Sequence, residues 1–84
     1  MKNFKNKVIA ITGAGSGIGR ELAIQLAIQN ATLSLNDFNA ESLKETVQLL
    51  QIPKTQVSQH VFDVGDETAM RNYIKDTISI HGQI

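Results

Sequence analysis

The chain has 84 residues, enough for one small domain with a marginal core. Hydrophobic residues make up 42% and charged residues 19%, a balance that is typical of a folded globular chain and too apolar for intrinsic disorder. Basic and acidic residues number 8 each, and the net charge of zero argues against general attraction to nucleic acid or to an anionic membrane. Any anion must therefore be bound by local groups.

The first predicted elements are a buried strand and a helix. The unbroken apolar run at residues 8–11 is typical of a parallel strand covered on both faces. Residues 18–29 repeat apolar side chains at four-residue steps, which predicts a helix whose apolar stripe packs on a sheet. The predicted stripe, with the small residues beside it, consists of Ile18, Leu22, Leu26, Ala23 and Ala27. Asn30 can end this helix, because asparagine tolerates the left-handed conformation.

Two further pairs of strand and helix follow. Alternating apolar residues at 31–36 predict a second short strand that ends at Asp37, and residues 55–64 predict a third strand. Asn39 and Asp66 are expected to cap the helices that come after these strands. The apolar stripe expected on the last helix consists of Met70, Ile74 and Ile78.

The order βαβαβα predicts an α/β fold of the Rossmann type, which is a doubly wound parallel sheet. A parallel neighbour can be reached only by crossing a face of the sheet, so the expected strand order is 3-2-1. In a complete sheet of order 3-2-1-4, residues 83–84 would begin the fourth strand. We therefore expect residues 1–84 to be the N-terminal half of such a domain, with an open edge at its first strand.

A glycine-rich loop, residues 12–19, lies between the first strand and the first helix. Glycines at such a junction allow a sharp turn and bring backbone N–H groups against a pyrophosphate, and the helix N-terminus adds about half a positive charge. The loop does not fit the general Gly-x-Gly-x-x-Gly pattern, because Ile18 or Arg20 stands at its third position, and it lacks the Gly-Lys-Ser/Thr of NTPases. An ordinary turn is the alternative, although four glycines in seven residues exceed its needs.

The loop does match Thr-Gly-x-x-x-Gly-x-Gly, and here the chain resembles the short-chain dehydrogenases/reductases in their compact form. The resemblance covers the whole chain, including Asp37 after the second strand and Asp63-Val64 after the third. It implies an oxidoreductase that binds NAD, or less readily NADP, and passes hydride between the nicotinamide and a small carbonyl or alcohol substrate. The cofactor-binding residues that it implies are Gly13, Ser16, Gly17, Ile18, Gly19, Asp37, Asp63 and Val64.

Asp37 is expected to select the cofactor. It follows Gly19 by 18 positions, close to the spacing of about 20 at which an acid meets the adenosine ribose. A carboxylate there accepts from both ribose hydroxyls and repels the 2′-phosphate of NADP by about 4 kcal/mol per unit charge pair at about 4 Å and a dielectric near 20. Ser16 and Phe38 occupy positions where NADP-using relatives tend to carry basic residues, so both positions favour NAD. The alternatives are a turn-forming Asp37 bonded within its own loop and simple capping by Asp63.

No side chain is assigned to catalysis. Tyr73 lacks the family's lysine four positions later, and we expect a half-buried helix residue with its hydroxyl in water. Arg20 could approach a phosphate, but a solvent-facing side chain is favoured. The two histidines, His60 and His81, share no metal-ligand spacing. By the resemblance, the catalytic Asn-Asn-Ala-Gly, Ser and Tyr-x-x-x-Lys would lie beyond the last residue, so the chain alone is expected to show no turnover.

Cysteine is absent, which excludes disulfides, thiolate nucleophiles and cysteine-based metal sites. The apolar run at residues 8–11 is too short for a signal peptide or a membrane span, so we expect a cytoplasmic protein. The expected partners are the dinucleotide, the substrate if the rest of the domain is present, and possible further copies of the chain, with no nucleic acid and no membrane. The alternative function is a non-catalytic dinucleotide-binding module or a truncated gene product.

Overall fold

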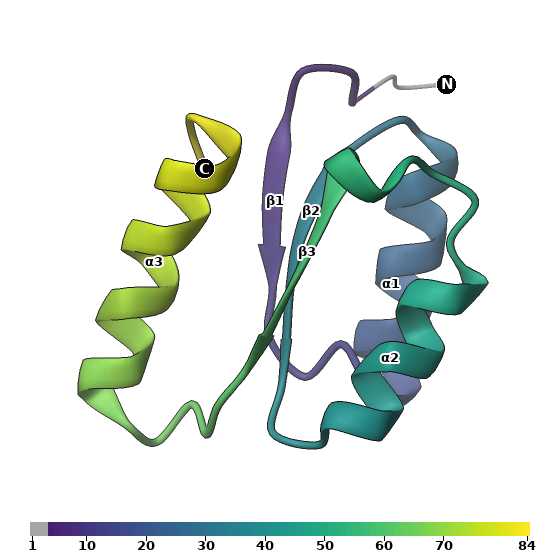
Figure 1. The fold of residues 1–84 in the computed structure, drawn as a ribbon. Helices are drawn as coiled ribbons and strands as arrows, with labels where there is room; N and C mark the ends of the chain where they lie inside the picture. The colour runs from purple at the N-terminus through teal and green to yellow at the C-terminus, as the bar shows by residue number, and fades with distance from the viewer. Residues whose placement is uncertain (1–3) are drawn as a thin grey trace.

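The computed structural model describes residues 4–84, in which three parallel strands form one sheet of order β1-β2-β3 (Figure 1). Strands and helices alternate along the chain, so the predicted α/β fold of the Rossmann type and its strand order are confirmed. The elements are β1 (Val8–Ile11), α1 (Gly17–Ile28), β2 (Thr32–Asp37), α2 (Ala40–Leu49), the 3-10 turn η1 (Lys54–Gln56), β3 (Val57–Val61) and α3 (Glu67–His81).

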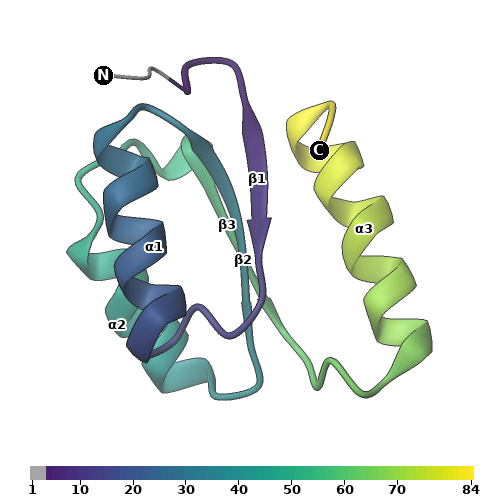
Figure 2. The same ribbon diagram turned by 180° about the vertical axis from the view of Figure 1, so that it is seen from behind.

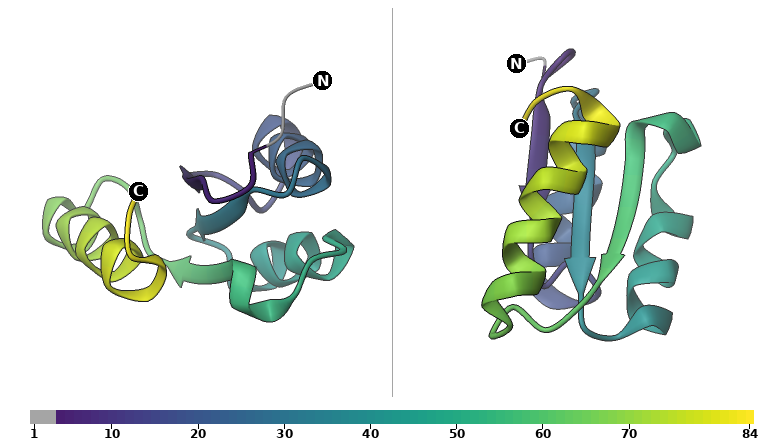
Figure 3. Two further views of the ribbon diagram at one scale, coloured as in Figure 1. Left: turned by 90° about the horizontal axis from the view of Figure 1, so that it is seen from above. Right: turned by 60° about the vertical axis from the view of Figure 1, so that its left-hand side comes forward.

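The sheet has helices on both faces. Helices α1 and α2 cover one face and α3 covers the other, as the two opposite views and the view from above show (Figures 1, 2 and 3). Parallel pairing places Ile11 beside Leu35, and Asp37 beside Val61. All three strands therefore end at the same edge of the sheet, where the three loops that lead into the helices gather, at the bottom of Figure 1.

Helix α1 packs through the two small residues of its predicted stripe, and not through Ile18 and Leu22. Its buried residues are Ala23 and Ala27, whereas Ile18 is 89% exposed and Leu22 is 46% exposed. Alanine side chains let the helix backbone approach the sheet closely, and this leaves no room for wider side chains between the two. Of the predicted large residues only Leu26 packs against the core, so that part of the prediction is wrong.

Helix α3 is held on the sheet by buried polar groups, and two expectations about it are wrong. Tyr73 is only 3% exposed, and its hydroxyl donates to the carbonyl of Ser34 at 2.5 Å instead of reaching water. The Thr77 hydroxyl lies 2.7 Å from that of Ser34 and is fully buried. The predicted stripe residues Ile74 and Ile78 are 43% and 45% exposed, because the face that meets the sheet is the one that carries Tyr73 and Thr77.

The predicted helix caps and helix ends agree with the structure better than the predicted bounds of the third strand do. Asn39 accepts from the N–H of Ser42, and Asp66 accepts from the N–H of Ala69, both at 3.0 Å. Asn30 has a φ of 69°, the left-handed conformation expected of it after α1. The third strand is shorter than residues 55–64, because η1 forms before it and residues 62–64 leave the sheet to reach α3.

Candidate functional site

The loops at the C-terminal ends of the strands enclose a cleft of about 250 Å³. Five of the eight predicted cofactor-binding residues line it, and they come from the loops after all three strands: Gly13, Ser16, Asp37, Asp63 and Val64. The other lining residues are Asn36, Phe38 and Phe62. The remaining three predicted residues, Gly17, Ile18 and Gly19, form the start of α1 outside this lining. A larger hollow of about 410 Å³ near the C-terminal ends of α1 and α2 contains none of the eight.

The glycine loop is the strand-to-helix turn that the sequence predicts, and its glycines are needed for two different reasons. Gly13 and Gly17 have positive φ angles of 68° and 55°, which L-residues with side chains adopt only with strain. Gly19 is needed for space instead, because a Cβ there would lie 2.1 Å from the carbonyl oxygen of Gly13. The loop therefore brings Gly13 against the first turn of α1.

The N-terminus of α1 presents unbonded donors. Within residues 4–84 the backbone N–H groups of Ser16, Gly17 and Ile18 form no hydrogen bond, and the Ser16 side chain does not cap the helix. The first turn of α1 carries no acidic residue. Free N–H groups at the positive end of a helix dipole suit an anion such as a pyrophosphate.

Asp37 is 7% exposed and holds its carboxylate between two loops. Its Oδ2 accepts from the N–H of Gly15 at 2.9 Å, and its Oδ1 accepts from the N–H of Asn39 at 3.0 Å. The second bond is the turn interaction that we considered as the alternative, and the first reaches across to the glycine loop. A carboxylate can accept about four hydrogen bonds, so both oxygens retain capacity toward the cleft that Asp37 lines.

Comparison with known proteins agrees with this geometry. Residues 7–84 match the family described as short chain dehydrogenase. The chain belongs to this family. The levodione reductase of Leifsonia aquatica is 39% identical over 83 residues, a match that covers 96% of this chain and 31% of that protein. The chain spans about a third of the length of such relatives, and the family to which it belongs is the one that it was predicted to resemble.

Solved structures of short-chain dehydrogenases superimpose closely on the chain. The apo-form of glucose dehydrogenase of Caenorhabditis elegans gives a TM-score of 0.92 at 30% identity, covering 96% of this chain and 35% of that one. A short-chain dehydrogenase/reductase of Burkholderia phymatum in complex with NAD gives a TM-score of 0.89 at 31% identity. This match covers 100% of this chain and 30% of that one. The family thus binds nicotinamide dinucleotides with this fold.

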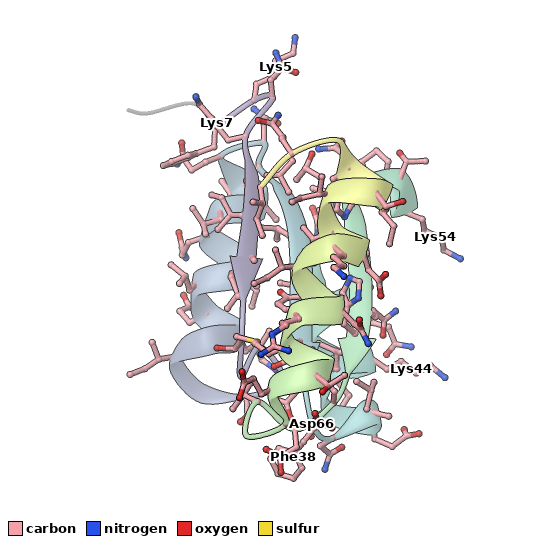
Figure 4. The ribbon with its side chains drawn as sticks, turned by 90° about the vertical axis from the view of Figure 1, so that its left-hand side faces the viewer. Lys5, Lys7, Phe38, Lys44, Lys54 and Asp66 are labelled. Atoms are coloured by element: carbon pink, nitrogen blue, oxygen red, sulfur yellow. The ribbon has the colours of Figure 1, made fainter. Side chains whose placement is uncertain are left out.

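Asp63 and Val64 lie in the loop that joins β3 to α3. The Asp63 carboxylate accepts from the N–H of Gly65 at 2.8 Å, so it shapes its own turn, while α3 is capped by Asp66. Val64 is 54% exposed at the cleft. Figure 4 shows Phe38 and Asp66 at this edge of the short-chain dehydrogenase sheet, with Lys5 and Lys7 at the far end.

Sequence reasoning missed Asn36, which is 1% exposed at the end of β2. Its amide nitrogen donates to the carbonyls of His60 and Phe62, both at 3.1 Å. It thereby fixes the chain where β3 leaves the sheet and where the cleft begins. A polar residue directly before Asp37, in a strand otherwise buried, was the available signal.

The expectation that Arg20 faces solvent is wrong. Its Nη2 donates to the carbonyls of Gly15 at 2.6 Å and Ser42 at 3.0 Å, and its Nε donates to the Thr46 hydroxyl at 2.8 Å. Arg20 therefore joins the glycine loop to α2. No sequence signal pairs Arg20 with Thr46, because 26 positions separate them and only the fold brings them together.

The histidines meet at one serine, which spacing alone did not reveal. The Nε2 atoms of His60 and His81 lie 2.7 Å and 2.8 Å from the Ser58 hydroxyl, which joins β3 to the end of α3. Among residues 4–84 no group of three or more histidine, aspartate or glutamate side chains is placed to hold a metal ion. Likewise, none of the described helices has the length and apolar character to cross a membrane.

We expect this histidine pair to make unfolding pH-dependent. Burial lowers the pKa of His60 below 6.5, against an opposing effect of Asp76, and burial also lowers the pKa of His81. The unfolded chain thus takes up protons first as the pH falls, so the free energy of unfolding should decline from about pH 6.5 downward and level off below the folded pKa values. Urea denaturation from about pH 8 to about pH 5 measures this.

The control is the double variant His60→Gln and His81→Gln, which removes both titrating rings. We expect its free energy of unfolding to vary less with pH over the same range, since the carboxylates titrate mainly at lower pH. The same slope in both proteins would show that the two histidines do not cause it.

Proposed function

We propose that this chain forms the cofactor-binding part of an NAD-dependent short-chain oxidoreductase that acts on a small carbonyl or alcohol. The observation that carries the proposal is the buried Asp37 carboxylate, which lines the cleft and is bonded to the glycine loop. Bound NAD would supply the hydride chemistry at its nicotinamide ring. No described side chain is proposed as a catalytic residue.

The residues present fit such a dinucleotide. The start of α1, at Ser16, Gly17, Ile18 and Gly19, offers free N–H groups for the pyrophosphate and has no side chain at Gly19 to separate it from Gly13. Asp37 would accept from the hydroxyls of the adenosine ribose.

The adenine would lie against the loop that follows β3. Asp63 and Val64 are exposed and line the same cleft as Asp37. Val64 and Phe38, which is 78% exposed, offer apolar surface against which the flat adenine ring can pack and be removed from water. This arrangement supports adenosine binding along the ends of the strands, with the pyrophosphate directed toward α1.

Isothermal titration calorimetry with NAD, NADP and AMP, which measures the affinity of the chain for each ligand, tests the proposal. We expect NAD to bind at least tenfold more tightly than NADP, because the 2′-phosphate would meet the Asp37 carboxylate. AMP should bind, since the ribose and adenine contacts do not need the nicotinamide half. Absence of binding by all three ligands would overturn the proposed function, and equal affinity for NAD and NADP would overturn its choice of cofactor.

A further inference from the structure

The middle of the glycine loop, Ala14-Gly15, is anchored from the side of the sheet. The N–H of Ala14 donates to the carbonyl of Asn36 at 2.8 Å, and the N–H of Gly15 donates to the Asp37 carboxylate at 2.9 Å. Both residues of this dipeptide are buried. The end of β2 therefore satisfies both N–H groups in the chain without a ligand.

The same dipeptide is anchored from α2 through side chains. Thr46 is fully buried, and its hydroxyl donates to the carbonyl of Ala14 at 2.7 Å. Arg20 donates to the carbonyl of Gly15 at 2.6 Å and also to Ser42 and Thr46. All four backbone polar groups of Ala14-Gly15 are therefore bonded to the scaffold, whereas the N–H groups that follow them, at residues 16–18, are unbonded in the described chain.

We infer that Thr46 and Arg20 are positioning residues that hold the glycine loop in its pyrophosphate-binding shape before the cofactor arrives. The inference rests on the proposed function and names the residues that prepare its phosphate site. Donors fixed in advance lose less conformational entropy on binding than donors on a mobile loop. The two side chains thus strengthen phosphate binding without touching the phosphate.

The geometry separates this role from direct phosphate binding. Three of the five N–H donors of the Arg20 guanidinium are used by Thr46, Gly15 and Ser42. Its charge is also 3.8 Å from the Glu45 carboxylate. Thr46 has no exposed surface and cannot reach a ligand. An effect of Thr46 on phosphate affinity would therefore have to act through the loop.

The test compares ligands that contain a pyrophosphate with one that lacks phosphate. Calorimetry with NAD and ADP, and ligand-detected NMR with adenosine, are applied to Thr46→Val, Arg20→Met and the double variant. Each single change should weaken NAD and ADP about tenfold and adenosine less than about twofold. The double variant should weaken ADP by less than the product of the single effects, because both side chains hold the same dipeptide.

Matched controls replace the same residue types on α3, with Thr68→Val and Arg71→Met, where both side chains are exposed. Their affinities for ADP should equal that of the unaltered chain. Thr46→Ser, which keeps the hydroxyl, should bind ADP as the unaltered chain does, and Thr46→Ala replaces Thr46→Val as the readout should that variant fail to fold. For Arg20→Met the corresponding variant is Arg20→Lys, which should still lose ADP affinity because a lysine cannot hold two carbonyls and Thr46.

The outcomes separate the possible failures. Loss of ADP affinity in Arg20→Met but not in Thr46→Val would make Arg20 a direct phosphate ligand and overturn the inference. Equal losses for ADP and adenosine would assign both residues a merely structural role and also overturn it. If the unaltered chain bound neither NAD nor ADP, the proposed function itself would fail, whereas normal binding that neither variant changes would remove only the inference.

Discussion

Replacing Gly19 by alanine is expected to weaken NAD binding roughly a hundredfold. The added Cβ would lie 2.1 Å from the carbonyl oxygen of Gly13 and 2.8 Å from its carbonyl carbon, so backbone must move. Such a shift separates the start of α1 from the loop and misaligns at least two donors to the pyrophosphate, each worth about a factor of ten. Calorimetric titration of the variant with NAD measures the effect.

The control for this prediction is Gly82→Ala. Gly82 has a φ of 82° at the end of α3, and a Cβ there would meet nothing within 4 Å. We expect a loss of about 1 kcal/mol in the free energy of unfolding from the strained conformation, with unchanged affinity for NAD. If Gly19→Ala bound NAD as tightly as Gly82→Ala, the contact between the loop and α1 would not be needed for binding.

The strands and caps could be predicted because each depends on neighbouring residues. The apolar run at residues 8–11 and the alternation at 31–36 are local patterns that indicate strands, and Asn39 and Asp66 cap helices through N–H groups three residues away. The face by which a helix packs depends instead on its partner. Periodicity places Ala23 and Ala27 in the stripe of α1, but it cannot tell that the helix meets the sheet through them and not through Ile18 and Leu22, since it favours the largest apolar side chains.

Residues of the candidate site could be predicted where each depends on one side chain or on one backbone angle. Gly13 and Asp37 were identified from the loop pattern and the spacing to the end of the second strand, and both line the cleft. The support behind the loop could not be predicted, because Arg20 and Thr46 act on carbonyls and meet only through the fold. Tyr73 shows the same limit, since its acceptor is a backbone carbonyl on β2, 39 positions away.

Replacing Asp37 by alanine is expected to reverse or abolish the preference for NAD. The change removes the acceptor for the ribose hydroxyls, so NAD should bind more weakly, and it removes the charge that repels a 2′-phosphate. It also releases the N–H groups of Gly15 and Asn39, which donate to the Asp37 carboxylate in the unaltered chain. Released backbone donors favour an anion, so NADP should bind at least tenfold more tightly to the variant than to the unaltered chain. Parallel calorimetric titrations with NAD and NADP measure both changes.

The matched control is Asp63→Ala, which removes a carboxylate from the same cleft. Asp63 is bonded to the N–H of Gly65 in its own turn and has no hydrogen bond to the glycine loop. We expect its loss to leave the ratio of NAD to NADP affinity unchanged, because the proposed function puts Asp37, and not Asp63, beside the ribose. The preference of the unaltered chain should also shrink as salt is raised, since screening weakens charge repulsion at a partly open site. A ratio that moved equally in both variants would mean that the general negative charge of the cleft selects the cofactor, and that the position of Asp37 does not.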